Sequence, residues 1–143
     1  MKLSTKSRYG TRILLELARH QDKGPLSNGM ISKIQNIPVK YLEQLVRILK
    51  QAQLVTSVRG PKGGHAIAMA PEKITLGQIV RLFETQTDLV VCISSPDQCD
   101  MADDCKVRLA WQEATQAMFE KLDGISIADL MMQEPLPGSR TAC

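Results

Sequence analysis

A segment rich in glycine and proline, between two short runs that suit β-strands, constrains the fold of this chain more than any other feature. It reads Arg59-Gly60-Pro61-Lys62-Gly63-Gly64-His65 and follows the run Val55–Val58. Glycine accepts positive φ angles and lets a backbone approach a ligand closely, and proline stiffens a turn. The pattern therefore predicts a β-hairpin that returns through residues 66–69. An arginine at its tip suits a phosphate or a narrow minor groove, and the alternative is an ordinary hairpin whose charges meet only water.

The spacing of apolar residues predicts three helices in front of this hairpin. Ser27 or Asn28 suits the cap of the second helix, and Pro38 suits the first turn of the third, where its missing N–H does no harm. The predicted spans are residues 8–20 after a lead-in of residues 1–7, residues 26–35, and a third helix whose apolar pattern runs from Tyr41 to Leu54. The predicted buried faces are Ile13, Leu14, Leu17 and Ala18; Met30, Ile31 and Ile34; and Leu42, Leu45, Val46 and Leu49.

Two short helices around a tight turn, followed by a basic hairpin, is the order of a winged helix-turn-helix. The outward residues Lys40, Glu43 and Gln44 would then reach base edges in the major groove. Arg59 and Lys62 of the wing would lie on the neighbouring backbone or minor groove. Residues 1–65 hold twelve Lys and Arg against three Asp and Glu, a charge of +9, whereas the remaining residues carry −6. This asymmetry favours a polyanion as partner of the first half over a three-helix module that binds protein.

The second half of the sequence predicts one short helix, one long helix and a long connection. Thr75 can cap a helix over Leu76–Phe83, and residues 85–104 show no pattern of regular structure, which is unusual unless such a segment has a function. The helix over residues 106–122 is apolar on most sides and needs cover, which a second subunit would supply. A last turn follows at 127–132. The predicted inward face of the long helix is Val107, Trp111, Ala114, Met118 and Leu122, widened by Leu109, Ala110, Ala117 and Phe119.

Three of the four cysteines, Cys92, Cys99 and Cys105, fall within fourteen residues. Neither a signal-peptide core nor an apolar run of membrane-spanning length occurs, so we expect a cytoplasmic protein without a membrane partner. Disulfides are improbable in that reducing compartment. The spacing fits zinc poorly, and three thiolates on one loop are similar to an iron–sulfur site that lacks one ligand. Thiols that only sense redox state, or that have no function, are the alternatives.

Motifs from both halves of the chain resemble one family in the family's own order. These are Met1-Lys2-Leu3-Ser4-Thr5-Lys6, Tyr41-Leu42-Glu43-Gln44-Leu45, Val58-Arg59-Gly60-Pro61-Lys62-Gly63-Gly64, the three cysteines, and Ile127-Ala128-Asp129-Leu130. The chain resembles the dimeric winged-helix iron–sulfur repressors that include IscR, NsrR and RirA, over residues 1 to about 132.

The resemblance implies a mainly α fold, a winged helix-turn-helix with a two-stranded wing plus a long C-terminal dimerisation helix. It implies base reading by Lys40, Glu43 and Gln44, a minor-groove contact by Arg59, and attachment of the recognition helix to the DNA backbone by Tyr41. It also implies that Cys92, Cys99 and Cys105 hold a 2Fe-2S or 4Fe-4S cluster. The expected organisation is residues 1–84 for DNA binding, 85–105 for the cluster, 106–132 for dimerisation and 133–143 as a flexible tail.

Two positions depart from the resembled family. The IscR type has a histidine three residues after its third cysteine, where this chain has Arg108. The NsrR type can take an acidic ligand from the partner's first helix, where this chain has Arg8. The fourth ligand is therefore unassigned. The residues open to this role are Glu16, His20, Asp100, Asp103, Asp104 and Cys143, besides a small molecule or thiol from solution.

We therefore expect a homodimeric DNA-binding transcription regulator, a repressor, whose iron–sulfur cluster senses cluster supply, iron, nitric oxide or redox state at a double-stranded operator. A clusterless thiol-redox regulator is one alternative. An iron–sulfur electron carrier is another, but it would leave the basic half and the wing unexplained. No enzyme is expected, because the sequence holds no Ser/His/Asp set and only two histidines.

Overall fold

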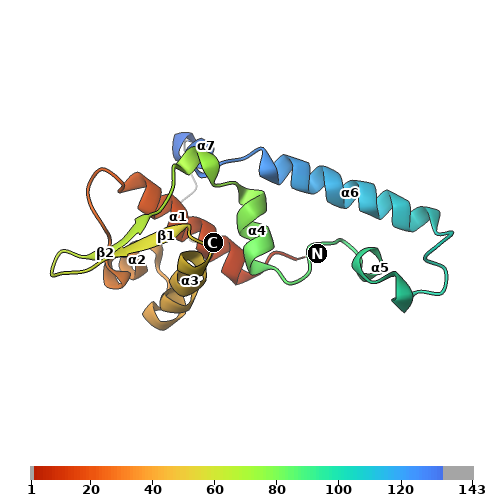
Figure 1. Ribbon diagram of the computed structural model, residues 1–143, viewed down its shortest axis with the longest axis horizontal. Helices are drawn as coiled ribbons and strands as arrows, with labels where there is room; N and C mark the ends of the chain where they lie inside the picture. The colour runs from red at the N-terminus through yellow and green to blue at the C-terminus, as the bar shows by residue number, and fades with distance from the viewer. Residues whose placement is uncertain (1, 134–143) are drawn as a thin grey trace.

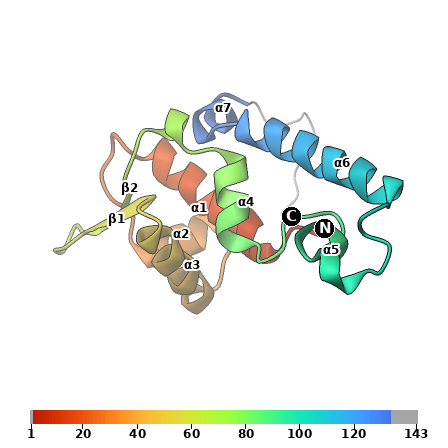
Figure 2. The same cartoon turned by 45° about the vertical axis from the view of Figure 1, so that its right-hand side comes forward.

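The structure is a computed structural model that describes residues 2–133. The predicted flexible tail and Cys143 therefore lie outside the described residues. The chain forms a body of packed helices with a small sheet, from which one long helix projects together with the segment before it (Figure 1). We call this projection the arm; it comprises residues 85–123 and lies at one end of the molecule in both views (Figure 2).

The mainly helical winged helix-turn-helix fold predicted from the sequence is confirmed. The body contains α1, α2, α3, a two-stranded sheet, α4 and α7, and the arm contains α5 and α6. The elements are α1 Thr5–Arg19, α2 Asn28–Gln35, α3 Val39–Gln51, β1 Val55–Val58, β2 Gly64–Ile67, the 3₁₀ turn η1 Pro71–Lys73, α4 Leu76–Phe83, α5 Val91–Ser94, the 3₁₀ turn η2 Pro96–Gln98, α6 Lys106–Asp123 and α7 Ile127–Met132.

Helix α1 begins earlier than expected, so the prediction of a lead-in through residue 7 is wrong. Ser4 is the N-cap, and its hydroxyl accepts a hydrogen bond from the Ser7 backbone N–H at 3.4 Å. The first turn was missed because it contributes no apolar residue to the periodic pattern. From Ile13 onward, the predicted face is buried in the core as expected.

The core of the body lies between α1, α3 and α4. The predicted stripe of α3 is buried throughout, and it gives this helix one apolar face and one free face. In α2 the prediction holds only for Ile31, because Met30 and Ile34 are 53% and 47% exposed. This short helix touches the core along a single line of residues, so its other apolar side chains remain at the surface. Helix α7 returns to the body, where Ile127 is fully buried.

The wing is an antiparallel pair in which Val55 faces Ile67 and Val58 faces Gly64. The return strand starts at Gly64, two residues before the predicted start, because His65 makes a further backbone bridge to Leu26. Leu26 N–H donates to the His65 carbonyl at 2.9 Å, and His65 N–H donates to the Leu26 carbonyl at 2.7 Å. Leu26 is thus drawn out of the predicted second helix, and the bridge fastens the base of the wing to the entrance of α2.

Helix α6 joins the arm to the body at its C-terminal end. The Arg81 guanidinium of α4 donates two hydrogen bonds of 2.7 Å to the Asp123 carboxylate and lies 4.3 Å from the centroid of the Phe119 ring. Thr115 and Phe119 are the buried residues of α6, and of these only Phe119 belongs to the predicted apolar face. That predicted face is largely open within one chain, with Val107 62% and Trp111 46% exposed. Among residues 2–133, no helix is both long and apolar enough to cross a bilayer.

The prediction that residues 85–104 lack regular structure is also wrong. The segment contains α5 and η2, and Ala102 in its last part is buried. These turns are too short to produce a periodic apolar pattern. They nonetheless set the positions of the cysteines, with Cys92 in α5, Cys99 directly after η2 and Cys105 as the N-cap of α6.

Candidate DNA-binding surface and cysteine segment

Helix α3 presents a polar face to solvent beside the wing. Lys40, Glu43 and Gln44 are exposed on its first two turns, and Arg47 and Lys50 continue the same side. Because the opposite stripe is buried, the helix cannot rotate to hide these groups. Five polar side chains with a net positive charge thus point away from the body at the position where a recognition helix meets a major groove.

A polar cluster that sequence reasoning missed fixes the helices of the helix-turn-helix relative to one another. Arg12 of α1 donates to the Gln35 side-chain oxygen at 3.0 Å and also to the Gln35 backbone carbonyl. The Gln35 amide donates to the buried Glu16 carboxylate at 2.7 Å. The Arg12 guanidinium lies 5.4 Å from the centre of the Tyr9 ring, which meets Tyr41 of α3 edge-on at 6.0 Å. Tyr41 is half-buried, and its ring contact with Tyr9 helps to position α3 on α1.

The wing carries its two predicted cations at an open tip. Arg59 and Lys62 are exposed, and within residues 2–133 neither takes part in an ion pair. Gly60, at φ 121°, turns the tip, and the Gly63 N–H closes it onto the Gly60 carbonyl at 2.9 Å. The tip is therefore a closed turn with free positive charge, which is the form that a backbone or minor-groove contact requires.

A groove runs between α3 and the base of the wing. Its walls include Asn28, Arg47, Lys50 and His65. Burial, followed by repulsion from Lys50, lowers the pKa of His65 below its ordinary value, so its ring is neutral at physiological pH. His65 then contributes a hydrogen bond of 3.0 Å to Ser57 across the two strands rather than a charge.

The three cysteines lie within residues 85–105, which we call the cysteine segment, but they do not form a compact group by themselves. Cys92 and Cys105 are half-buried and Cys99 is exposed, and all three are free thiols. Nowhere in residues 2–133 do three Cys, His, Asp or Glu side chains gather as a metal site would require. In number and chemistry, however, the donors suit an iron–sulfur cluster, because thiolates are its usual ligands. The segment thus supplies three fitting donors and needs rearrangement and a further ligand to enclose a cluster.

Arg108 is the residue that holds this segment against α6. Its Nε donates to the Cys92 carbonyl at 2.8 Å, and another guanidinium nitrogen donates to the Ala102 carbonyl at 3.2 Å. Its backbone N–H points to the Cys105 sulfur at 3.4 Å, as an N-cap contact. The sequence marked Arg108 only as a departure from a histidine. Its contacts could not be inferred, because they depend on how the segment folds back.

Two of the open fourth-ligand positions are engaged inside the body. The Glu16 carboxylate accepts from Gln35 and lies 3.1 Å from the His20 ring nitrogen. The acidic residues at positions 100, 103 and 104 are exposed at the end of the arm, next to the cysteines in sequence. Cys143 is outside the described residues. The structure therefore places only the acidic group on the same segment as the cysteines.

The start of the cysteine segment is tied to the N-terminus of α1 by one carboxylate. Glu84, the residue that ends α4, accepts hydrogen bonds from the Ser4 N–H and hydroxyl, both at 2.8 Å, and from the Ser7 hydroxyl. Burial alone would raise the pKa of Glu84, but the hydrogen bonds from Ser7 and Ser4 outweigh it and lower the pKa. Serines three apart at a helix start are a capping signal, but nothing in the sequence identified their distant partner.

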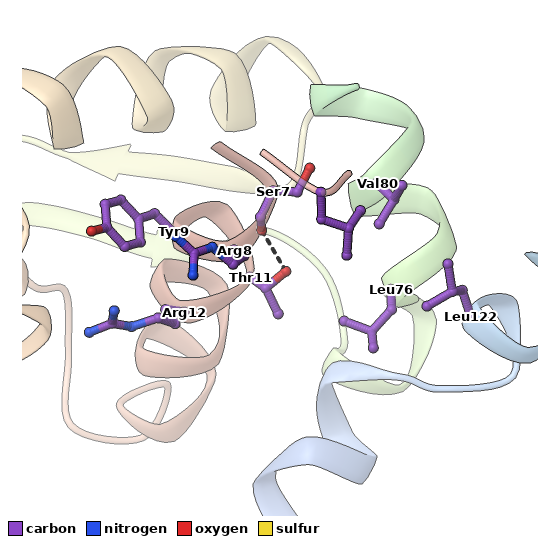
Figure 3. A pocket seen from close by; sticks show the side chains of 9 residues that line it. Ser7, Arg8, Tyr9, Thr11, Arg12, Leu76, Val80 and Leu122 are labelled. Carbon is purple, nitrogen blue, oxygen red and sulfur yellow. Dashed lines mark hydrogen bonds between the residues drawn. The ribbon is translucent and has the colours of Figure 1, made fainter. Parts of the chain in front are cut away.

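An apolar pocket of about 290 Å³ lies where α1, α4 and the end of α6 meet (Figure 3). Leu76 and Val80 of α4 line one side, Leu122 of α6 another, and Leu3 and the first turns of α1 the rest. In the figure Leu76, Val80 and Leu122 lie on one side and Ser7 and Thr11 of α1 on the other, while Tyr9 and Arg12 lie farther from the three apolar side chains. Leu122 is also the last residue of the open apolar face of α6, so the pocket and that face are continuous.

The structure combines a helix-turn-helix, formed by α2 and α3, with a two-stranded wing, and the basic side of α3 faces solvent. This is the architecture of winged-helix DNA-binding transcription regulators. The family model described as "Rrf2: Iron-dependent Transcriptional regulator" matches residues 3–133. The chain belongs to this Rrf2 family.

Known proteins that are similar to this chain match it over nearly its whole length. The protein rrf2 of Nitratidesulfovibrio vulgaris is 41% identical over 136 residues, which are 95% of this chain and 91% of that protein. The structure of CymR (YrzC), the global cysteine regulator of B. subtilis, is similar with a TM-score of 0.79 and 36% identity, covering 94% of this chain and 99% of that one. For T. potens IscR the TM-score is 0.72 and the identity 34%, over 92% and 86% of the two chains. The chain is thus a transcription regulator and not an enzyme.

Proposed function

We propose that this regulator binds a double-stranded operator as a homodimer and that an iron–sulfur cluster held by its cysteine segment changes its affinity for that operator. The DNA-binding part of the proposal rests on one observation. The exposed polar face of α3 lies beside the wing, whose tip is open and basic. Lys40, Glu43 and Gln44 then read bases, while Arg59 enters the minor groove or meets the backbone. Lys62 adds a phosphate contact, and Tyr41, whose ring meets Tyr9 of α1, helps to fix the recognition helix on the DNA backbone.

Arg59→Ala is expected to weaken operator binding for all sequences and to lower the slope of log affinity against log salt by about 1, because one cation contact is lost. Gln44→Ala should instead change base preference at one position, by about 1–3 kcal/mol. Fluorescence anisotropy with operator variants at several salt concentrations measures both effects. Lys73→Ala is the matched control, since Lys73 is an exposed cation of the body that lies in η1, outside α3 and the wing. Binding by Arg59→Ala equal to wild type at every salt concentration would exclude the wing from the interface.

The proposed dimer interface is the open apolar face of α6. Val107, Trp111, Ala114 and Met118 repeat at the spacing of a helix–helix seam, and they lead through Leu122 into the apolar pocket. In a two-fold pair with antiparallel α6 helices, the N-terminal half of one helix covers the C-terminal end of the other. Each exposed stripe would therefore lie on the partner's pocket. The same pairing would bring each cysteine segment toward the partner's α1.

We expect sedimentation analysis to show a dimer, and Trp111→Glu to convert it to a monomer, because burying an unpaired carboxylate in an apolar interface is strongly unfavourable. Gln112→Glu adds the same charge one residue away, off the apolar stripe, and should remain dimeric. Operator half-sites should lie about one or more helical turns apart. A wild-type protein that is a stable monomer both with and without a cluster would refute the pairing.

The cluster is proposed from the donor set, with Cys92, Cys99 and Cys105 as its protein ligands. When bound, it would supply a centre that oxidant, nitric oxide or iron shortage can alter. The role of the chain is to position the cysteines relative to the DNA-binding body. Arg108 holds two of the three cysteines on α6, and Glu84 joins the segment to α1, so a rearrangement of the segment has a direct connection to the DNA-binding body.

A clusterless thiol-redox regulator is the second candidate. It is favoured by the separation of the three sulfurs, which are free thiols and form no metal-binding group in the part of the chain that the structure describes. The visible absorption spectrum of protein purified without oxygen separates the two, because only a cluster absorbs there. Under the second candidate the protein would be colourless, and its operator affinity would respond to oxidant in proportion to the loss of free thiols.

A further inference from the structure

The Arg108 side chain bonds to the backbone of the cysteine segment at two separate places, Cys92 and Ala102. The carbonyls of Cys92 and Ala102 are ten residues apart in sequence, yet both accept hydrogen bonds from this guanidinium. The planar, always charged guanidinium offers several donors in fixed directions, so it can serve two carbonyls at once. An ammonium group in the same place would be a single point of attachment.

Among the described residues, the side chain of Arg108 has no hydrogen-bond partner besides these two carbonyls. Its side chain is only partly exposed, and within residues 2–133 it forms no ion pair with the nearby acidic residues. Bonds from a charged donor to neutral carbonyls are stronger than neutral ones. Arg108 therefore closes a loop that runs from Cys92 to the first turn of α6, whose N-cap is Cys105.

We propose that the Arg108 side chain is a positioning group that holds the Cys92 backbone against the start of α6, where Cys105 is the N-cap, so that the cysteine segment is ordered in part before any ligand binds. In this role Arg108 is not a ligand and takes no part in chemistry. The proposal deepens the proposed function, since a segment fixed in this way would lower the ordering cost of holding a cluster. The claim about order concerns the metal-free chain, and it can be tested whether or not a cluster forms.

The test compares Arg108→Ala and Arg108→Lys with wild type in the metal-free, reduced full-length protein. Rates of alkylation by iodoacetamide are followed by mass spectrometry of the peptides that carry Cys92, Cys99 and Cys105. We expect Arg108→Ala to accelerate the reaction at Cys92 about tenfold, because the charge-assisted hydrogen bonds that hold its backbone against α6 are lost. Cys105 contacts the backbone N–H of residue 108, which alanine keeps, so its rate should stay close to that of wild type. Cys99 is already exposed and should react at an unchanged rate, which makes it the internal control. Arg108→Lys should fall between the two.

Lys106→Ala is the matched variant, since it removes an exposed cation from the same helix turn. It should leave all three rates as in wild type, and circular dichroism of every variant should show the same helix content. An unchanged rate at Cys92 in Arg108→Ala would overturn the proposal, as would equal acceleration by Lys106→Ala.

A second measurement separates this proposal from the proposed function. Anaerobic reconstitution with iron and sulfide should load wild type and Lys106→Ala equally, and Arg108→Ala more slowly. A wild-type protein that takes up no cluster would refute the cluster, while the alkylation rates would still decide the role of Arg108. Full and equally fast loading of Arg108→Ala, in protein whose Cys92 has been shown to react faster, would refute the preorganisation.

Discussion

Replacing Cys92, Cys99 or Cys105 by alanine is expected to abolish stable cluster binding in each single variant. Each thiolate would be one of at most four anchors, and the loss of one leaves an iron open to solvent and oxidant. The fold should survive, because none of the three side chains is buried in the core. What should be lost is the response of operator binding to oxygen or nitric oxide.

Iron content and visible absorption of anaerobically prepared protein measure this effect. Cys143→Ala is the control, and we expect it to retain the cluster, because the segment Pro135-Leu136-Pro137-Gly138 separates Cys143 in sequence from the other three cysteines. Full cluster retention in any of the first three variants would remove that cysteine from the site. Loss in Cys143→Ala would instead identify the fourth ligand.

Gly64→Ala is expected to lower the free energy of unfolding by about 3 kcal/mol. Gly64 has φ 153°, and a Cβ there would overlap the Leu26 carbonyl group and lie 2.7 Å from the Ser27 backbone nitrogen. The atoms in the way belong to the backbone, and the bridge between Leu26 and His65 would have to separate. The variant should therefore also detach the wing from α2 and weaken operator binding.

Gly60→Ala separates backbone strain from this overlap. Gly60 has φ 121° and no atom within 4 Å of a Cβ, so only the strain of a positive φ is added, about 1 kcal/mol. Urea unfolding followed by circular dichroism, at one protein concentration, compares the two variants. Equal destabilisation by both would show that the close approach of β2 to Leu26 contributes nothing.

The body of the fold was largely predictable because its signals are local. The stripe of α3 from Leu42 to Leu49, the run Val55–Val58 and the Thr75 cap each report their own conformation, and each is confirmed by the structure. The errors have a common cause. The start of α1, the early start of β2 and the turns near Cys92 depend on polar capping or on a distant backbone partner, and neither produces apolar periodicity.

The residues of the candidate site could be predicted from the sequence, but the hydrogen bonds that hold them in place could not. Residue type and position indicated the polar face of α3, the wing cations and the cysteines, which remain predictions as functional residues. Arg12, Glu84 and Arg108 were not singled out for what they hold, since each bonds to groups that lie far along the chain or in an irregular segment. The open face of α6 was indicated, because a helix apolar on most sides cannot be covered by so small a chain.

The hydrogen bonds between Glu84 and the first turn of α1 have a consequence for the operator as well as for the protein. Helix α1 contacts α3 through Tyr9 and Tyr41, so the start of the cysteine segment and the recognition helix are attached to the same rigid element. Coupling between two binding equilibria is reciprocal. Under the proposed function, whatever factor a cluster contributes to operator affinity, a bound operator contributes the same factor to cluster affinity. Regulator molecules on DNA and free in solution would then hold their clusters with different strength, and the number of operator sites would influence how much iron or oxidant is needed to switch them.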